Sequence, residues 1–364
     1  MQIKIPCVLM RGGTSRGPYF LASDLPLDEA TRDRVLLAAM GSPHTLQVDG
    51  LGGGHPLTSK VAIVSLSERP DADIDFLFAQ VSVDRPVVDT SPNCGNMIAG
   101  VAPFAIEAGL IPAEIGETRV RIHNRNTGAL VDAFIQTPGG QVEYEGTTVI
   151  DGVGGTAAPV KLNFMNAAGS KTGALFPTGR LREEIDGVEV SLVDYAMPML
   201  LLKAESVGLA GDESAEDIDQ MPDLLARLER MRLEAGRRMG LGDVTGRVIP
   251  KIGVLSAPKF GSITSRYFVP DRCHKAHAVT GALCVATAAS ITGTVAADVT
   301  RVTPGGPFVL EHPSGRIDID LDIQLADEAN AIAVQRAAVL RTTRRIFEGS
   351  LLVPSAVWPQ RAGA

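Results

Sequence analysis

Short apolar runs that alternate with polar residues recur along the chain, and longer apolar runs with helical spacing lie between some of them. In the first half this pattern predicts a hairpin of strands at 3–10 and 18–22, an amphipathic helix at 28–40, and strands at 61–65 and 75–83. A polar loop follows, and after it an Ala- and Ile-rich run predicts a central apolar helix that begins near Cys94.

The second half repeats this order of elements. Its pattern predicts a hairpin at 188–193 and 200–204, an amphipathic helix at 222–239, strands at 250–256 and 266–269, an apolar helix at 278–289 and a hairpin at 308–319. The period, about 190 residues, is far too long for a solenoid. We therefore predict an α+β fold of two pseudo-symmetric domains, each a strongly curved, barrel-like mixed sheet around one central apolar helix.

The repeat also predicts where the domains end. We expect the first domain at 1–183 and the second at 184–345, with a tail at 346–364 that returns to pack on the first domain. Both central helices are expected to point their N-termini at a shared cleft, because ligands usually bind between domains. Free N–H groups and partial positive charge at each helix end favour a small polycarboxylate in such a cleft.

Composition and charge narrow the classes of protein. The 364 residues are 45% hydrophobic and 21% charged, so the chain can bury a sizeable core. The formal net charge of −8 argues against a nucleic-acid partner. The longest apolar run, near 276–299, is interrupted by Thr, Gly and Ser, which predicts a buried helix and no membrane span. The N-terminus opens on a strand pattern, unlike a signal peptide, so the expected location is the cytoplasm.

The cysteines are candidates for chemistry because one of them begins a helix. Cys94 follows Asn93, the expected N-cap, and helix N–H groups at that position lower the pKa of a thiol. The matching place in the second half holds Thr280 and Gly281, with no thiol. The other three cysteines are Cys7, Cys273 and Cys284. Cys273 and Cys284, in the second half, are expected mainly in the core. None forms a C-x-x-C pair or a zinc-like spacing with His, so we expect no metal and reduced thiols.

Because the second half has no thiol to match Cys94, a second acid–base group that could work with Cys94 must come from another residue type. Lys60 stands at the mouth of an apolar strand, and that strand precedes the Cys94 loop in the same half. Burial would lower the pKa of its amine and allow it to act as a base. We therefore expect Lys60 and Cys94 to work as a pair.

Several short motifs taken together resemble the PrpF family. They are Arg11-Gly-Gly-Thr-Ser-Arg-Gly17, Leu57-Thr-Ser-Lys-Val-Ala62, Asn93-Cys-Gly-Asn96, Pro177-Thr-Gly179, Thr280-Gly281 and Glu311-His-Pro-Ser-Gly315. The resemblance covers essentially the whole chain and implies the diaminopimelate-epimerase-like fold with no cofactor. It also implies that a double bond in an unsaturated tricarboxylate is moved by 1,3-proton transfer.

The resemblance also implies roles for individual residues. The family's catalytic pair falls on Lys60 and Cys94. The residues implied to hold the substrate carboxylates are Thr14, Ser15, Asn93, Gly95, Asn96, Thr280 and Gly281. Two features depart from the family: Arg16 stands where a Lys is usual, and the segment 121–126 is unlike the tautomerase pattern. A homodimer is a further expectation, and the small-molecule substrate is the only other partner expected.

The resemblance also implies a substrate, 4-oxalomesaconate, in the bacterial breakdown of gallate, protocatechuate and lignin-derived aromatics. The motifs most like those of the corresponding tautomerases are Met10-Arg-Gly-Gly-Thr14, Met40-Gly-Ser-Pro43 and Gln47-Val-Asp-Gly50. A methylaconitate or methylitaconate isomerase with the same catalytic pair is an alternative. A non-catalytic metabolite-binding accessory protein is another, while the missing second thiol argues against a racemase.

Overall fold

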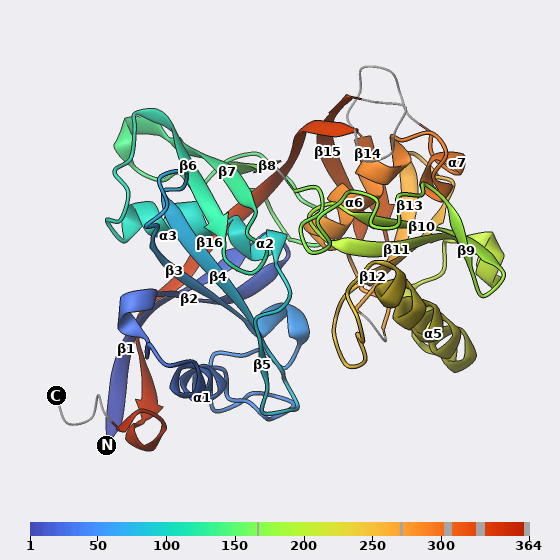
Figure 1. Ribbon diagram of the computed structural model, residues 1–364. Helices are drawn as coiled ribbons and strands as arrows, with labels where there is room; N and C mark the ends of the chain where they lie inside the picture. Colours follow the sequence, from blue (N-terminus) through green and yellow to red (C-terminus); the bar gives the residue numbers. More distant parts are fainter. Residues whose placement is uncertain (166, 270–271, 302–307, 325–331, 360–364) are drawn as a thin grey trace. The chain divides into compact units, whose positions relative to one another are not determined.

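The computed structural model describes residues 1–165, 167–269, 272–301, 308–324 and 332–359 (Figure 1). Contacts between residues divide the chain into two compact units. Unit 1 contains Met1–Leu162 and Arg341–Ala364, and unit 2 contains Asn163–Leu340. The expected domain boundaries lie at 183 and 345, and residues 360–364 of the expected tail are outside the described residues.

Unit 1 is a closed barrel. In hydrogen-bonded order its strands are β1 (Gln2–Gly12), β2 (Ser15–Leu21), β3 (Lys60–Leu66), β4 (Ile74–Val81), β6 (Gly116–Asn124), β7 (Leu130–Thr137), β8 (Pro159–Met165) and β16 (Ala333–Pro354). The ring closes because the last part of β16 pairs antiparallel with β1, from Gln2 opposite Pro354 to Gly12 opposite Thr343. The pairs β2–β3 and β4–β6 are parallel, so the sheet is mixed, and the short β5 (Val88–Asp89) pairs with β4.

Unit 2 repeats the pairing order of unit 1. Its strands are β9 (Glu183–Ile185), β10 (Val188–Asp194), β11 (Pro198–Lys203), β12 (Lys251–Ser256), β13 (Ile263–Phe268), β14 (Phe308–His312), β15 (Gly315–Gln324) and the first part of β16. From β10 to β14 the successive pairs are antiparallel, parallel, antiparallel and parallel. The same alternation runs through β1, β2, β3, β4 and β6. The predicted α+β fold of two pseudo-symmetric halves is therefore confirmed.

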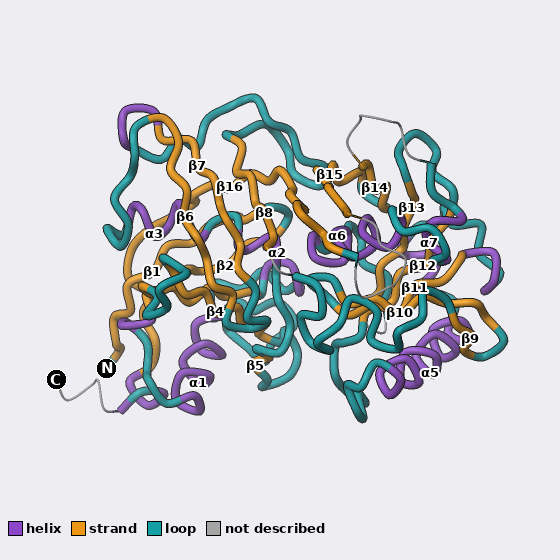
Figure 2. The backbone as a smooth tube through the Cα atoms, turned by 45° about the horizontal axis from the view of Figure 1, so that its top comes forward, coloured by secondary structure: helices purple, strands orange, loops and turns teal. Residues whose placement is uncertain are grey.

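Helices pack on both faces of each sheet (Figure 2). The α-helices are α1 (Glu29–Met40), α2 (Gly95–Ile98), α3 (Val101–Glu107), α4 (Ala215–Asp219), α5 (Pro222–Arg238), α6 (Val279–Ala289) and α7 (Val295–Asp298). The 3-10 helices are η1 (Ala22–Asp24), η2 (Pro56–Thr58), η3 (Pro138–Gly140), η4 (Ala204–Val207) and η6 (Ser355–Val357).

The two faces can be told apart from neighbouring residues of one strand. Tyr19 of β2 faces α2, because its hydroxyl donates to the carbonyl oxygen of Met97. The next residue, Phe20, belongs to the apolar cluster that α1 forms with β1, β3 and β4. Since successive strand residues point to opposite faces, α2 and α1 lie on opposite sides of the sheet. In unit 2, α5 joins a cluster with β9–β13, while α6 is buried along its whole length against β10–β12, β14 and β15.

The central helix expected in unit 1 is divided in two. Ala99 and Gly100 separate α2 from α3. Pro103 has no N–H to donate to the carbonyl of Ala99, so one helical hydrogen bond is missing there. The Tyr19 hydroxyl donates to the carbonyl oxygen of Met97 at 2.5 Å. Gly100 leaves room for this phenol, because a Cβ at that position would lie 2.5 Å from its oxygen.

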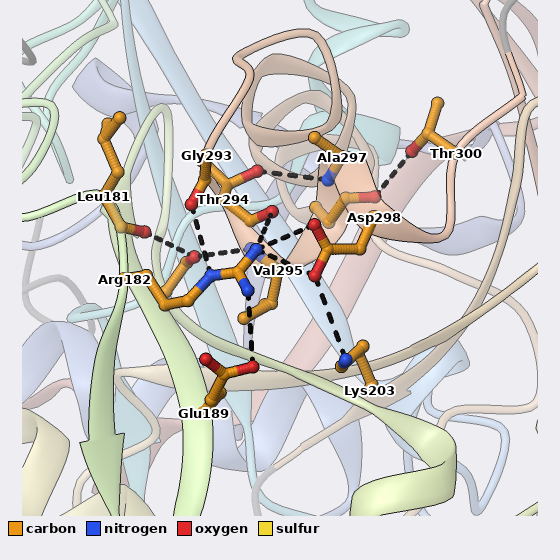
Figure 3. A network of polar contacts seen from close by, with 12 residues as sticks. Leu181, Arg182, Glu189, Lys203, Gly293, Thr294, Val295, Ala297, Asp298 and Thr300 are labelled. Atoms are coloured by element: carbon orange, nitrogen blue, oxygen red, sulfur yellow. Dashed lines mark hydrogen bonds and ion pairs between the residues drawn. The ribbon is translucent and has the colours of Figure 1, made fainter.

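A polar network holds α7 against the sheet of unit 2 (Figure 3). The guanidinium of Arg182 donates to both carboxylate oxygens of Asp298, each at 2.7 Å. It also donates to the carbonyl oxygen of Thr294 at 3.1 Å, and pairs with Glu189 of β10 at 3.3 Å. Lys203 of β11 lies 3.8 Å from Asp298. One side chain thus connects the N-terminal and C-terminal ends of a short helix to a strand.

Asp194 is expected to stabilise the loop before β9. Its fully buried carboxylate accepts from Ser170 Oγ at 2.7 Å, from the N–H groups of Lys171 and Thr172, and from Thr172 Oγ1 at 2.9 Å. We expect Asp194→Ala to lower the free energy of unfolding by about 2–4 kcal/mol, because buried donors lose their acceptor. Urea unfolding measures this loss.

The control is Asp71→Ala, which removes a carboxylate from an exposed ion pair with Arg69. Its expected effect is under about 1 kcal/mol. Equal losses for the two variants would contradict the role given to Asp194.

Candidate active site

The turn between β1 and β2 is the first part of the site. Residues 11–17, which connect the two predicted strands 3–10 and 18–22, are themselves strand except for the two-residue turn Gly13–Thr14. The turn is held because Arg11 Nη1 donates to the carbonyl oxygen of Gly13 at 2.9 Å. Ser15 follows the turn and is buried, and its hydroxyl has no hydrogen-bond partner among the described residues. A bound group can therefore use that hydroxyl without breaking a hydrogen bond of the described chain.

Cys94 begins the central helix of unit 1. It is the N-cap of α2, in an extended conformation, and is partly exposed. The sequence predicts Asn93 as the N-cap. Because the first helical residue is Gly95, the residue before it, Cys94, is the N-cap instead. In the first turn, Asn96 Nδ2 donates to Thr14 Oγ1 at 3.0 Å. The thiol and the hairpin turn are thus brought to the same end of the barrel.

Buried polar atoms at this end lack partners. The Oδ1 atoms of Asn93 and Asn96, like the Ser15 hydroxyl, form no hydrogen bond within the described part of the chain. The hairpin approaches Asn96 closely, since a Cβ on Gly13 would lie 2.2 Å from its Oδ1. Unpaired buried polar atoms are costly, so a polar ligand that pairs with them is favoured.

Lys60 supplies a basic group at the same end of unit 1. It is the first residue of β3, and its Nζ donates to Gln80 Oε1 at 2.5 Å and lies 5.1 Å from the centroid of the Phe78 ring. Burial lowers the pKa of the Lys60 amine, and the charge of Cys94 acts in the opposite direction. The two predicted proton-transfer groups therefore lie in the same unit, close enough for the charge of one to act on the other.

The Gly-rich segment 49–55 packs around Gln47, which in turn contacts the residue before Lys60. It wraps around the buried side chain of Gln47, and a Cβ on Gly52 would lie 2.2 Å from that amide. Gln47 Nε2 donates to Ser59 Oγ at 2.7 Å, immediately before Lys60 in the chain. The segment therefore holds protein side chains, an arrangement that its glycine content alone did not indicate.

Asn126 fixes the approach to Cys94 and was not identified from the sequence. From the turn between β6 and β7, its Oδ1 accepts from the N–H of Phe78, and its Nδ2 donates to the carbonyl oxygen of Phe78, both at 2.8 Å. Nδ2 also donates to the carbonyl oxygen of Thr90 at 2.7 Å. This side chain joins β4 to the segment that leads to Cys94; the only sequence signal was its place in a turn.

Unit 2 has an equivalent helix start without a thiol. Ala278 is the N-cap of α6, and the Thr280 hydroxyl, fully buried, has no hydrogen-bond partner among the described residues. A Cβ on Gly281 would lie 2.4 Å from the ring of Tyr267. The expected position of Thr280 and Gly281 beside the Lys60 and Cys94 pair stays a prediction.

The two other cysteines of unit 2 lie in its core. Burial raises the pKa of the Cys273 thiol to about 12, and burial also raises the pKa of the Cys284 thiol. Cys273 belongs to the apolar cluster beneath α5. Both thiols are therefore expected to stay protonated near neutral pH.

Within the described residues, no group of three or more His, Cys, Asp or Glu side chains could hold a metal ion. None of their helices is long and apolar enough to cross a membrane.

Comparison with known proteins decides the family. A model described as "PrpF protein" matches residues 2–354. The chain belongs to the PrpF family. This PrpF-family chain is 52% identical to the protein YbhH of Escherichia coli, over 96% of this chain and 99% of that one. It is 47% identical to 4-oxalomesaconate tautomerase of Pseudomonas putida, over 98% of each chain.

A solved structure extends the match to the fold. The crystal structure of methylitaconate-delta-isomerase is similar to this PrpF-family chain with a TM-score of 0.82 and 38% sequence identity, covering 98% of this chain and 97% of that one. Family and relatives together make this PrpF-family chain an isomerase.

Proposed function

We propose that the protein is a cofactor-independent isomerase that moves a C=C bond by 1,3-proton transfer in 4-oxalomesaconate, an unsaturated tricarboxylate. The observation that carries the proposal is the placement of two groups in unit 1: the Lys60 amine, held by Gln80 Oε1 at 2.5 Å, and the Cys94 thiol at the start of α2. Burial lowers the pKa of that amine, and the charge of Cys94 acts on it. The name of the Pseudomonas putida relative supports the choice of substrate.

The proposed reaction has two proton transfers. An oxo or carboxylate group conjugated with the alkene acidifies the allylic C–H, and the neutral Lys60 amine removes that proton. Hydrogen-bond donors of the site stabilise the dienolate, an effect usually worth several kcal/mol, roughly 3–4 for one donor. Cys94 then gives a proton to the far carbon. The proton taken up by Lys60 then passes to the Cys94 thiolate, which restores both groups for the next turnover, and in the reverse direction the pair exchanges roles.

The carboxylates of the substrate are assigned to polar groups of both units. In unit 1 the unpaired Ser15 hydroxyl and the side chains of Asn93 and Asn96 support this assignment. The remaining proposed contacts are Thr14, Gly95, Thr280 and Gly281. The proposal extends to a cytoplasmic homodimer in the breakdown of gallate or protocatechuate.

Proton NMR of the purified protein with 4-oxalomesaconate in deuterated water tests this function. We expect the double bond to move and deuterium to appear at one allylic carbon, whose position identifies the target of the base. Turnover of methylitaconate or methylaconitate alone would contradict the proposed substrate and favour the second candidate, to which the similar crystal structure points. If none of these substrates is turned over, the result would contradict an allylic isomerase and favour a metabolite-binding protein.

Cys94→Ser is expected to lower kcat/KM for 4-oxalomesaconate about 10²-fold, at the lower end of the effect of a positioned acid or base. A serine hydroxyl is a far weaker acid than a thiol, but it occupies the same N-cap and conserves the shape of the site. Steady-state kinetics measure the loss.

The matched control is Cys7→Ser, which changes a buried thiol in the apolar cluster beneath α1. It is expected to reduce stability and to leave kcat/KM of the folded protein within about 3-fold of the original, because it lies outside the acid–base site. A normal kcat/KM for Cys94→Ser would remove the thiol from the reaction.

A further inference from the structure

Gln80 contacts Lys60 from the neighbouring strand. In the antiparallel pair β3–β4 the two residues are directly opposite, so their side chains leave the sheet on the same face. Phe78, two residues before Gln80, occupies that face as well, with its ring 5.1 Å from the Lys60 Nζ. The register of two strands therefore places a neutral amide and an aromatic ring beside the amine.

The orientation of the Gln80 amide is fixed by the backbone. Its Nε2 donates to the carbonyl oxygen of Ser59 at 2.9 Å and to that of Pro56 at 3.1 Å. A carbonyl oxygen can only accept, so the reversed amide would lose both hydrogen bonds. Oε1 must therefore face Lys60, whose Nζ donates to it at 2.5 Å.

This contact gives the amine a direction. A neutral amine has two N–H groups and one lone pair, and one N–H is held by the oxygen of Gln80. The lone pair consequently points away from Gln80, toward the remaining surroundings of Nζ. A neutral oxygen also adds no negative charge, whereas a carboxylate at this place would favour the ammonium form.

Gln80 also touches the segment that leads to the thiol. On its other side β4 pairs with β5, and Gln80 is opposite Asp89 in that register. Asp89 Oδ1 accepts from the N–H of Ser91 at 2.8 Å, shortly before Cys94. The strand position that orients the amine is therefore also a support of the Cys94 loop.

We propose that Gln80 is the positioning residue of Lys60: it holds one N–H of the amine and directs the lone pair toward the carbon that loses its proton. This inference rests on the proposed function of Lys60. Cys94 is the titratable group whose charge acts on the amine, and Gln80 and Phe78 are its neutral neighbours.

Two substitutions separate orientation from bulk. Gln80→Met keeps the length of the side chain but removes the acceptor, and we expect kcat to fall about 10- to 100-fold while KM changes less than about 3-fold. Gln80→Glu keeps an acceptor and adds charge. We expect it to move the acidic limb of the pH profile of kcat/KM to higher pH by at least about one unit, because the carboxylate favours the protonated amine.

Gln136→Met is the matched control, since the Gln136 side chain donates to the exposed Glu117 rather than to Lys60 or Cys94. It is expected to keep the original kcat and pH profile. A structural role for Gln80 predicts equal losses in both Gln80 variants with no movement of the pH profile. That result, or full activity of Gln80→Met, would overturn the proposal.

A titration without substrate distinguishes this proposal from the proposed function. The ¹³Cε resonance of Lys60, assigned by its absence in Lys60→Met, is followed against pH in the original protein and in Gln80→Glu. A raised midpoint in Gln80→Glu supports the contact even where 4-oxalomesaconate is not turned over, a result that would contradict only the proposed function. An unchanged midpoint in an active enzyme would overturn the role of Gln80.

Discussion

Lys60→Met is expected to abolish isomerisation, with kcat/KM lowered at least about 10³-fold. Methionine fills a similar volume, but it cannot accept the allylic proton. Exchange of that C–H in deuterated water should therefore disappear together with double-bond migration, and proton NMR measures both. Lys259→Met, which removes an amine from an exposed ion pair with Asp212, is the control and should keep full activity. Full activity of Lys60→Met would exclude Lys60 as the base.

The same variant reports on the amine through its stability. Burial lowers the pKa of Lys60 in the folded protein below its ordinary value of 10.5. Folding is therefore penalised at low pH, where both states are protonated, and the penalty disappears as pH rises from the lowered pKa to 10.5. Relative to Lys60→Met, the original protein should gain free energy of unfolding over that interval. Parallel curves of stability against pH would show that the Lys60 amine is not desolvated.

Gly17→Ala is expected to have the largest effect on stability. A Cβ at this position would lie 1.7 Å from the carbonyl oxygen of Lys60 and 2.7 Å from its carbonyl carbon. Both are backbone atoms, so β2 and β3 would have to move apart. We expect the free energy of unfolding to fall by at least about 3 kcal/mol in urea unfolding, and activity to fall with it because Lys60 is displaced.

Gly154→Ala is the control, because a Cβ there meets no atom within 4 Å. Its expected effect is within about 0.5 kcal/mol, as for other surface substitutions. Similar losses in the two glycine variants would show that β2 can accommodate a side chain at position 17.

The repeat and its main elements could be predicted because they depend on local patterns. Asp28 caps α1 through the N–H of Thr31 at 2.8 Å, a signal carried by four neighbouring residues. Lys60 was identified by its place at the mouth of an apolar strand, and β3 begins at that residue. Alternation and capping act over a few residues, so they can be recognised in one sequence.

Features that depend on distant residues could not be predicted. At the break in the central helix of unit 1, the carbonyl oxygen of Met97 accepts from the Tyr19 hydroxyl, which comes from a strand 78 residues away. The contact of Gln80 with Lys60 depends on the register of β3 and β4, which places residues 20 apart in the sequence opposite each other. Asn126 is informative only once its turn is known to lie against Phe78 and Thr90.

The pairing of β1 with the last part of β16 sets an order of events during synthesis. The strands that carry Lys60 and lead to Cys94 leave the ribosome early. The part of β16 that pairs with β1 and closes the barrel is made only with residues 343–354. All of unit 2 is translated in the interval. Because domains generally fold as their residues become available, the half of the protein that is begun first must be completed last. A nascent chain stopped before residue 343 would carry both proton-transfer groups on an unfinished barrel with an exposed strand edge.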